Sequence, residues 1–331
     1  VSLLAGPGSD GADFVIPELD FDRSRARKIA VNAFGSLTDY ENGQLLIDEI
    51  HSLSGIIEEK LSLIVNNIKP DFVLIHNIFS HGRHIASAQA FYNVLKKKKI
   101  PALSTHHDFY WERDVFQQPC CPGIQQFLRK YVPPVLPNLQ HAVISKRAAA
   151  SLFKHSQIEA TVMPDTLDFS MTPWTKDSYN EDLLSHFDVS ENDILILQAT
   201  RIVKRKGIEL LLPILEKLND KKYLKQLIGR KLYNGKTITE SSKFILILAG
   251  YAEKEAVDYL NDITSNLKSR NIPYRNIQAV IGAEREQRES GKQYSLFDTY
   301  TFADIVSYPS LFEGWGNQFL EAVFAKKPII A

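Results

Sequence analysis

Two carboxylates close to the C-terminal end of the chain, Glu313 and Glu321, lie eight positions apart around a glycine-containing loop. The apolar run over residues 304–308 before the loop predicts the end of a buried strand, and the pattern over 317–326 predicts a helix that Pro328 ends. A strand, a glycine loop and a helix N-terminus form an anion site, because free backbone N–H groups and the helix dipole point outward there. Carboxylates beside such a loop can accept hydrogen bonds from hydroxyl groups. The spacing therefore suits the binding of a phosphate joined to a polyol, as in a nucleotide sugar.

A cluster of cations, Arg201-Ile-Val-Lys-Arg-Lys206, is the second chemical signal. It follows an apolar run over residues 194–199 that predicts a strand, and ligands of open α/β sheets bind at the carboxyl ends of parallel strands. Arginine can grip a phosphate with two parallel hydrogen bonds, whereas lysine acts as a point charge. We expect Arg201 and Lys206 to neutralise a diphosphate, and we interpret Lys204 and Arg205 as solvated loop residues.

The string P-S-x-x-E-G-x-G-x-x-x-x-E-A over residues 309–322 resembles the signature of the retaining glycosyltransferases of family 4, which have the two-domain GT-B fold. The resemblance implies that Glu313 contacts hydroxyl groups of the donor sugar and that Glu321 contacts the nucleotide ribose. The loop residues that would line the donor are Gly314, Trp315, Gly316 and Asn317. The alternative interpretation is a helix N-terminus whose acidic residues only complement the helix dipole.

The cations carry the same resemblance, because Arg201 and Lys206 fall on the two basic positions of R-x-x-x-x-K-G at 201–207. By resemblance they stabilise the diphosphate as the bond to the sugar breaks, which is electrostatic catalysis. Gly250, directly after the apolar run over 244–249, is similar to the family's turn beside the base or the phosphates. We therefore include Gly250 among the donor-binding residues.

A histidine-rich segment, Ser104-Thr-His-His-Asp108, follows a short apolar stretch in the first half of the chain. It is similar to the T-x-H-D pattern of the family, which implies that His107 lies near the donor sugar and the acceptor, with His106 as the second choice. A lone histidine is more often structural, so the spacing alone is a weak signal. The further residues expected on the acceptor side are His76, Asp108 and Arg113. A metal site built from His76, His81 and His84 is an alternative that their irregular spacing does not favour.

The resemblance implies retaining chemistry on one face of the sugar, without a protein nucleophile and without a metal or other cofactor. The leaving phosphate would take the acceptor proton, and His107 would orient the substrate. The catalytic residues would then be His107, Arg201, Lys206 and Glu313. Asp20-Phe-Asp22 matches the metal-binding D-x-D of the other large glycosyltransferase fold, but no nucleotide-binding strand pattern precedes it.

The alternation of apolar runs and helical patterns predicts an α/β protein. With the resemblance, we expect a GT-B fold of two Rossmann-like, doubly wound domains facing across a cleft. Residues 1–165 would form the acceptor-side domain, and 166–331 an incomplete nucleotide-sugar-binding domain. Both ends read as truncated, because Val1–Gly6 resembles the second strand of such a domain and a further strand starts at Pro328.

The individual elements follow from hydrophobic periodicity. The predicted strands are 28–31, 71–76, 102–105, 142–145, 194–199 and 244–249. The predicted helices are 43–68, 83–99, 146–153, 207–218 and 253–270. We interpret the charged, weakly periodic segment 220–242 as a surface insertion.

Composition limits the class of protein. The chain has 331 residues, of which 44% are hydrophobic and 24% charged, which is typical of a globular protein with a sizeable core. The formal net charge of zero gives no basic surplus for nucleic acid, and no run of eighteen apolar residues predicts a membrane span. The adjacent Cys120 and Cys121 do not suggest a structural disulfide, so we expect a cytoplasmic location with contact to the inner face of a membrane at most peripheral.

The expected partners are a nucleotide-sugar donor and an acceptor that is a sugar, a small solute or a lipid-linked glycan. Two other functions stay open at this point. One is a non-catalytic GT-B relative that acts as a binding or partner subunit. The other is a glycan phosphorylase of the same fold, for which the sequence offers no cofactor lysine or phosphate pocket.

Overall fold

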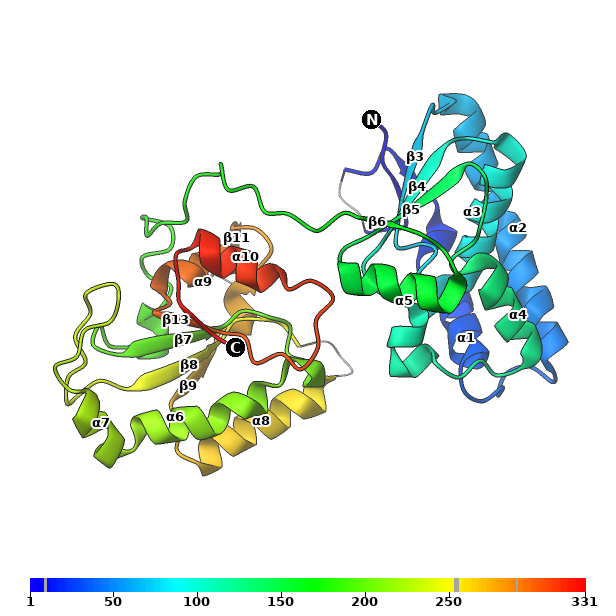
Figure 1. The fold of residues 1–331 in the computed structure, drawn as a ribbon. Coiled ribbons are helices and arrows are strands. Elements are labelled where there is room, and N and C mark those ends of the chain that lie inside the picture. The colour runs from blue at the N-terminus through cyan, green and yellow to red at the C-terminus, as the bar shows by residue number, and fades with distance from the viewer. Residues whose placement is uncertain (9–10, 253–255, 290) are drawn as a thin grey trace. The chain divides into compact units, whose positions relative to one another are not determined.

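The computed structural model describes residues 1–8, 11–252, 256–289 and 291–331 (Figure 1). The chain folds into two compact units, Val1–Asp165 and Thr166–Ala331. Both units are α/β structures whose main sheets are wholly parallel. None of the described helices is both long enough and apolar enough to cross a membrane.

The first unit has a four-stranded sheet in the order β3-β4-β5-β6. Its elements are β1 (Leu4–Ala5), β2 (Phe14–Val15), α1 (Ser24–Ala33), α2 (Gly43–Ile68), β3 (Val73–His76), α3 (Ile85–Lys98), β4 (Ala102–His106), α4 (Pro122–Tyr131), β5 (Leu139–Val143), α5 (Lys146–Ser156) and β6 (Thr161–Val162). Helices α1 to α4 pack together over one face of this sheet, whereas α5 covers part of the other (Figure 1).

The structure confirms the helix predicted for residues 43–68, which is α2. The residues that start this helix, form its apolar face and end it all lie within or next to this one segment. The Asn42 side chain accepts a hydrogen bond from the Leu45 N–H at 3.1 Å, which caps the N-terminus. Lys69 ends the helix in the left-handed conformation. The buried apolar residues between these caps recur every three or four positions: Leu46, Ile50, Leu53, Ile57, Leu61 and Val65.

Two predictions for the first unit are wrong. Residues 28–31 lie inside α1 and not in a strand, because Ala26, Ile29 and Ala33 form one buried helical face. The three apolar residues of Lys28-Ile-Ala-Val31 cannot by themselves distinguish a helix from a strand. The segment Val1–Gly6 is not a strand of the main sheet either, since among the described residues β1 pairs with β2 in a separate two-stranded sheet.

The second unit has a five-stranded sheet in the order β14-β13-β7-β8-β9. Its elements are β7 (Ile194–Gln198), α6 (Leu212–Asn219), α7 (Lys221–Leu227), β8 (Phe244–Leu248), α8 (Val257–Ser269), β9 (Tyr274–Asn276), β10 (Ile281–Gly282), β11 (Glu286–Arg288), β12 (Gly291–Ser295), α9 (Leu296–Phe302), β13 (Ile305–Ser307), α10 (Asn317–Phe324) and β14 (Ile329–Ile330). The predicted helix 253–270 corresponds to α8, and the start predicted at 253 lies outside the described residues.

Both faces of this sheet are buried, which explains why β8 and the first four residues of β7 are uninterrupted apolar runs. Ile194 and Ile196 of β7 point into the core that contains α6 and α8, whereas Leu195 and Leu197 point into the core that contains α9 and α10. Figure 1 shows these two helix pairs on opposite faces of the sheet.

The segment 220–242 is more ordered than a plain surface insertion, because it contains α7 and is tied to the buried Asp304. The Asp304 carboxylate accepts hydrogen bonds from the Leu195 N–H at 2.9 Å, from Asn234 Nδ2 at 2.8 Å and from Lys236 Nζ at 2.7 Å. One carboxylate therefore joins the insertion to β7, the central strand of the sheet.

Replacing Asp304 with asparagine is expected to lower the free energy of unfolding by about 1–3 kcal/mol, because Lys236 and the Leu195 N–H lose a charged acceptor. Denaturation in urea would measure this as a lower midpoint. Asp188→Asn is the matched control, since the Asp188 side chain is fully exposed and should leave the midpoint unchanged. Equal midpoints for Asp304→Asn and the wild type would contradict the anchoring role.

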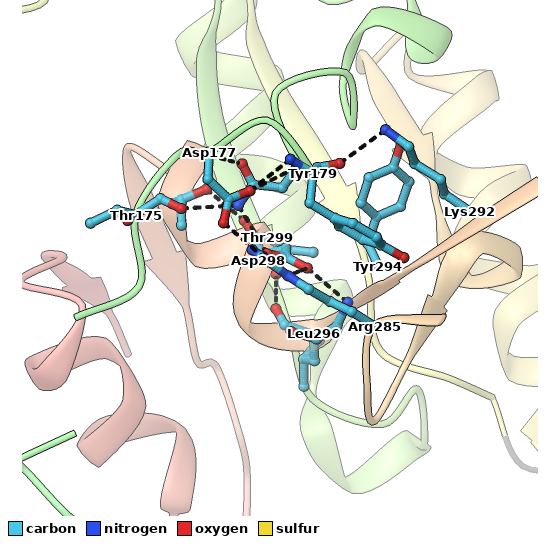
Figure 2. A network of polar contacts seen from close by, with 12 residues as sticks. Thr175, Asp177, Tyr179, Arg285, Lys292, Tyr294, Leu296, Asp298 and Thr299 are labelled. Atoms are coloured by element: carbon cyan, nitrogen blue, oxygen red, sulfur yellow. Dashed lines mark hydrogen bonds and ion pairs between the residues drawn. The ribbon is translucent and has the colours of Figure 1, made fainter. Parts of the chain in front are cut away.

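A polar network fixes helix α9 against the segment that precedes β7 (Figure 2). The Arg285 side chain contacts both oxygens of Asp298, with Nε at 3.0 and 3.1 Å, and also reaches Asp177 at 2.8 Å. Asn180 Nδ2 donates to Asp298 at 2.9 Å. Asp298 in turn accepts from the Ser295 N–H at the start of α9. Because Asp298 is only 3% exposed, these bonds fix the N-terminus of α9 firmly.

Candidate functional site

The strand order of the second unit places the two predicted donor motifs side by side. Strands β8 and β9 lie on one side of β7, while β13 and β14 lie on the other. The order in which strands are added to the sheet therefore reverses between β7 and β13, which makes this a topological switch point. Ligands of open α/β sheets bind at the carboxyl ends of strands at such a switch point. The cationic loop leaves β7 and the Glu313 loop leaves β13, so both motifs open at this point.

Below the loops, buried polar groups join the two strand ends. Ser307 Oγ donates to the Gln198 side-chain oxygen, and Gln198 Nε2 donates to Thr200 Oγ1 at 2.6 Å. Gln318, at the start of α10, donates to the Ser307 carbonyl at 3.3 Å. Gln198 and Ser307 are fully buried, so these bonds fix the relative position of the two loops.

Two glycines allow the backbones to approach closely at this site. A Cβ atom on Gly207, whose φ is +59°, would lie 2.5 Å from the Pro309 carbonyl oxygen. A Cβ atom on Gly250 would lie 1.7 Å from the Thr200 carbonyl oxygen. Gly250 thus has a packing reason to be glycine, and its predicted contact with the donor stays a prediction.

An ion-pair cluster connects the cationic loop to the acidic motif. Lys206 pairs with Glu313, and Arg205 Nη1 donates to the Glu313 carboxylate and to the Phe312 carbonyl, both at 3.1 Å. The Lys206 side chain is only 8% exposed, whereas that of Arg205 is 40% exposed. The structure therefore brings Lys206 and Glu313 together. Arg205, which we expected to be a solvated loop residue, is partly exposed but also forms an ion pair with Glu313.

Protonation of this cluster follows from burial and charge. Burial alone would raise the pKa of Glu313, but the contact with Lys206, the nearby Ser310 hydroxyl and the charges of Lys206 and Arg205 lower it overall. Burial lowers the pKa of Lys206, the Glu313 carboxylate opposes this, and the nearby charges of Arg205 and Arg201 lower it further. Lys206 and Arg205 thus share one carboxylate, and the positive charge of Arg201 also acts on Lys206.

Glu321 points into a different environment. Its Oε2 accepts a hydrogen bond from Tyr300 at 2.5 Å, and burial raises its pKa, while Tyr300 and the charge of Lys206 act in the opposite direction. Within the described part of the chain this carboxylate has no ion-pair partner within 4 Å. A half-buried carboxylate without a salt bridge weakens the fold, which is typical of a residue kept for binding.

Glu321→Gln is therefore expected to gain stability relative to the wild type as pH rises. Because the pKa of Glu321 is higher in the folded than in the unfolded chain, its favourable contribution is complete below the unfolded pKa and is lost as pH rises through the folded value. Urea denaturation of both proteins from pH 4 to pH 8 would measure the difference. A difference in unfolding free energy that does not change with pH would contradict this assignment.

The remaining donor-motif residues surround the N-terminus of α10. Gly316 is its N-cap and supplies no capping side chain, so the first N–H groups of the helix have no side-chain acceptor there. Gly314, Trp315 and Asn317 are exposed around it. Tyr308 lies below, with its ring 4.5 Å from that of Phe319.

In the first unit, residues at the carboxyl ends of β3 and β4 gather around Asn77. The Asn77 side-chain oxygen accepts from the His107 N–H at 2.9 Å, and its amide lies 3.2 Å from His76 Nε2. The His76 and His107 rings meet edge to face at 4.5 Å, and His107 Nε2 lies 3.2 Å from Asp165. The position of Asn77 next to His76 at a predicted strand end already suggested acceptor contact, whereas Asp165 was missed by the sequence reasoning.

Asp108 and Arg113, both predicted on the acceptor side, bind each other. Arg113 contacts one oxygen of Asp108 with Nε at 2.7 Å and Nη2 at 2.5 Å. The other oxygen lies 3.2 Å from His81 Nε2. Burial lowers the pKa of His81 to about 4, so this imidazole is neutral near pH 7.

His106 has a different environment from His107. It is fully buried, its Nδ1 lies 2.6 Å from Ser80 Oγ, and its Nε2 lies 2.9 Å from His141 Nδ1. Both ring nitrogens are thus occupied inside the unit, so we do not carry the acceptor-side prediction for His106 forward.

The metal alternatives gain no support from the geometry. Among the described residues, no three or more His, Cys, Asp or Glu side chains are grouped so that they could hold a metal ion. The Asp20-Phe-Asp22 segment is a local turn, in which Asp20 accepts the Asp22 N–H at 2.9 Å.

Comparison with known proteins identifies the family. No protein-family model matches the chain. It is 32% identical over 328 residues to the mannosylglucosylglycerate synthase of Petrotoga mobilis, covering 99% of this chain and 74% of that protein. It is also 32% identical over 333 residues to the enzyme of that name from Thermotoga maritima, covering 100% of this chain and 72% of that protein.

Solved structures share the fold. Sucrose-phosphate synthase from Thermosynechococcus elongatus superposes with a TM-score of 0.53 at 15% identity, covering 91% of this chain and 64% of that one. Anabaena HepE in complex with UDP gives a TM-score of 0.53 at 13% identity, covering 99% and 79%. The expected GT-B fold is confirmed, and the chain belongs to the same glycosyltransferase family as the mannosylglucosylglycerate synthases and is a nucleotide-sugar-dependent hexosyltransferase.

Proposed function

We propose that this enzyme transfers a mannosyl group from a nucleoside diphosphate to glucosylglycerate, with retention of configuration and without a metal. The relatives' name, mannosylglucosylglycerate synthase, supports the choice of sugar and acceptor. The observation that carries the donor site is the Lys206–Glu313–Arg205 cluster at the switch point between β7 and β13.

The donor is proposed to bind to the second unit. Its diphosphate would contact Arg201, Lys206 and the uncapped N–H groups of α10, because a helix N-terminus and buried cations both favour anions. Once Lys206 engages the diphosphate, Glu313 would be available to accept hydrogen bonds from the sugar hydroxyls. Glu321 would accept from the ribose hydroxyls.

The proposed reaction breaks the bond between C1 of the mannosyl group and the diphosphate oxygen. The acceptor hydroxyl oxygen bonds to C1 on the same face, and its proton passes to the leaving diphosphate. Lys206 and Arg201 stabilise the negative charge that develops on that group. His107, held by Asn77 and Asp165, would orient the substrates.

The test is an assay with mannose and glucose donors on both guanosine and uridine diphosphate, with glucosylglycerate as acceptor. Transfer of mannose, with the anomeric configuration of the donor seen by NMR and with full activity in EDTA, would support the proposal. An inverted product or loss of activity in EDTA would overturn those parts, and glucose transfer alone would overturn the choice of sugar.

A further inference from the structure

We propose that Tyr300 is a positioning residue for the donor site, whose phenol hydroxyl orients the Glu321 carboxylate toward the nucleotide ribose. The inference rests on the proposed function, because the contact between Glu321 and the ribose is itself proposed. Tyr300 lies on α9, outside both donor motifs, and neither the sequence analysis nor the comparison with relatives assigns it a role.

Tyr300 and Glu321 are joined by one short hydrogen bond. Tyr300 Oη lies 2.5 Å from Glu321 Oε2, and in the described part of the chain it is the one hydrogen bond that this carboxylate makes. A carboxylate offers about four acceptor positions on its two oxygens. One bond to Oε2 therefore fixes the rotamer of Glu321 and leaves the other oxygen free to accept from hydroxyl groups of a ligand.

Tyr300 can only act as the donor in this pair. Burial, the Glu321 charge and the hydrogen bond raise its pKa well above the usual value, so the phenol keeps its proton at any working pH. The bond also opposes the effect of burial on Glu321, so it helps to keep that carboxylate ionised. An ionised carboxylate accepts stronger hydrogen bonds than a neutral acid.

The phenol has a fixed position because its helix is fixed. Tyr300 is fully buried, and its ring lies 5.3 Å from that of Trp174. The N-terminus of α9 is held by the Asp298 network with Arg285 and Asn180 (Figure 2). A flexible glutamate is thus oriented by a rigid partner before the ligand arrives, so less rotamer freedom remains to be lost on binding.

The experiment measures nucleotide affinity by calorimetric titration with GDP and UDP and with their 2′-deoxy forms. The proteins are the wild type, Tyr300→Phe, Glu321→Ala, the double variant and Tyr294→Phe. Tyr294→Phe is the matched control, because the Tyr294 phenol also donates to a carboxylate, Asp182 at 2.8 Å, away from the donor motifs.

Tyr300→Phe is expected to weaken binding of the preferred ribonucleotide about tenfold, since hydrogen bonds to charged groups have about that effect. It should also reduce the preference for ribose over 2′-deoxyribose. The double variant should bind no worse than Glu321→Ala, because the two residues act as a unit. The loss of nucleotide affinity in Tyr300→Phe should grow as pH falls from 8 to 5. Without the phenol, Glu321 takes up a proton at a higher pH than it does in the wild type.

Each other outcome is decisive. Wild-type affinity in Tyr300→Phe together with weak binding in Glu321→Ala overturns the role of Tyr300 and leaves the proposed function standing. Equal losses in Tyr300→Phe and Tyr294→Phe, or additive losses in the double variant, indicate a merely structural effect and also overturn it. Wild-type affinity in Glu321→Ala, or no binding by the wild type, overturns the donor site itself.

Discussion

Replacing Lys206 with methionine is expected to lower kcat/KM for the sugar nucleotide by about 10²–10³-fold, the usual effect of losing one group that stabilises developing charge. Methionine keeps the apolar stem in its buried position, so the change removes mainly the charge. Lys206 is the least exposed cation of the cluster, and charges act more strongly where water is excluded. Initial rates with the preferred donor would measure the loss.

Lys204→Met is the control for this prediction. Lys204 lies in the same 3-10 turn, Lys204–Lys206, but is exposed and forms no ion pair among the described residues. Its variant should keep wild-type rates. Similar rates in Lys206→Met and Lys204→Met, with both proteins folded by thermal unfolding, would contradict an electrostatic role for Lys206.

Glu313→Gln is expected to lower kcat/KM for the donor by one to two decades. A hydrogen bond to a charged group contributes about 1.5–3 kcal/mol, and each 1.4 kcal/mol corresponds to a factor of ten. Glutamine keeps the size of the side chain but removes the charge that holds Arg205 and Lys206 and that is proposed to strengthen hydrogen bonds from the sugar hydroxyls. Steady-state kinetics with varied donor concentration would measure the change.

The matched control is Glu216→Gln, because Glu216 also pairs with an arginine, Arg270 at 3.2 Å, but is half exposed on the surface. We expect it to behave as the wild type. The wild type and Glu313→Gln would also be assayed with donors whose sugar lacks the 2-hydroxyl or the 3-hydroxyl. If removing the hydroxyl lowered the activity of both proteins by the same factor, the proposed contact between Glu313 and the sugar hydroxyls would be wrong.

The stability predictions for Asp304 and Glu321 depend on how many hydrogen-bond partners each carboxylate has inside the protein. Asp304 is a buried carboxylate whose acceptor positions are filled by the protein itself, so its loss weakens the fold. Glu321 is a partly buried carboxylate with one phenol partner, so its charge weakens the fold and is kept for another reason. The number of internal partners thus separates a structural carboxylate from one that is available to a ligand.

Local signals were enough for much of the fold. Helix α2 has its cap, its apolar stripe and its end within one continuous segment, and β7 and β8 are apolar runs whose length and β-branched residues predict buried strands. The strand predicted at residues 28–31 was wrong because three consecutive apolar residues fit a helix and a strand equally well. Helix α7 was missed because only seven residues form it, and it is stabilised by packing of Leu224 and Leu227 on the core of the second unit.

The sequence by itself determined the residues of the proposed donor site, because Glu313, Glu321, Arg201 and Lys206 are specified by type and spacing within two short segments. Only the tertiary structure decided their partners. Lys206 and Glu313 are 107 positions apart, and they meet because the sheet places β13 beside β7. Tyr300 and Glu321 meet because α9 and α10 pack on the same face of that sheet. Strand order and helix packing follow from burial of the whole core, which no single segment specifies.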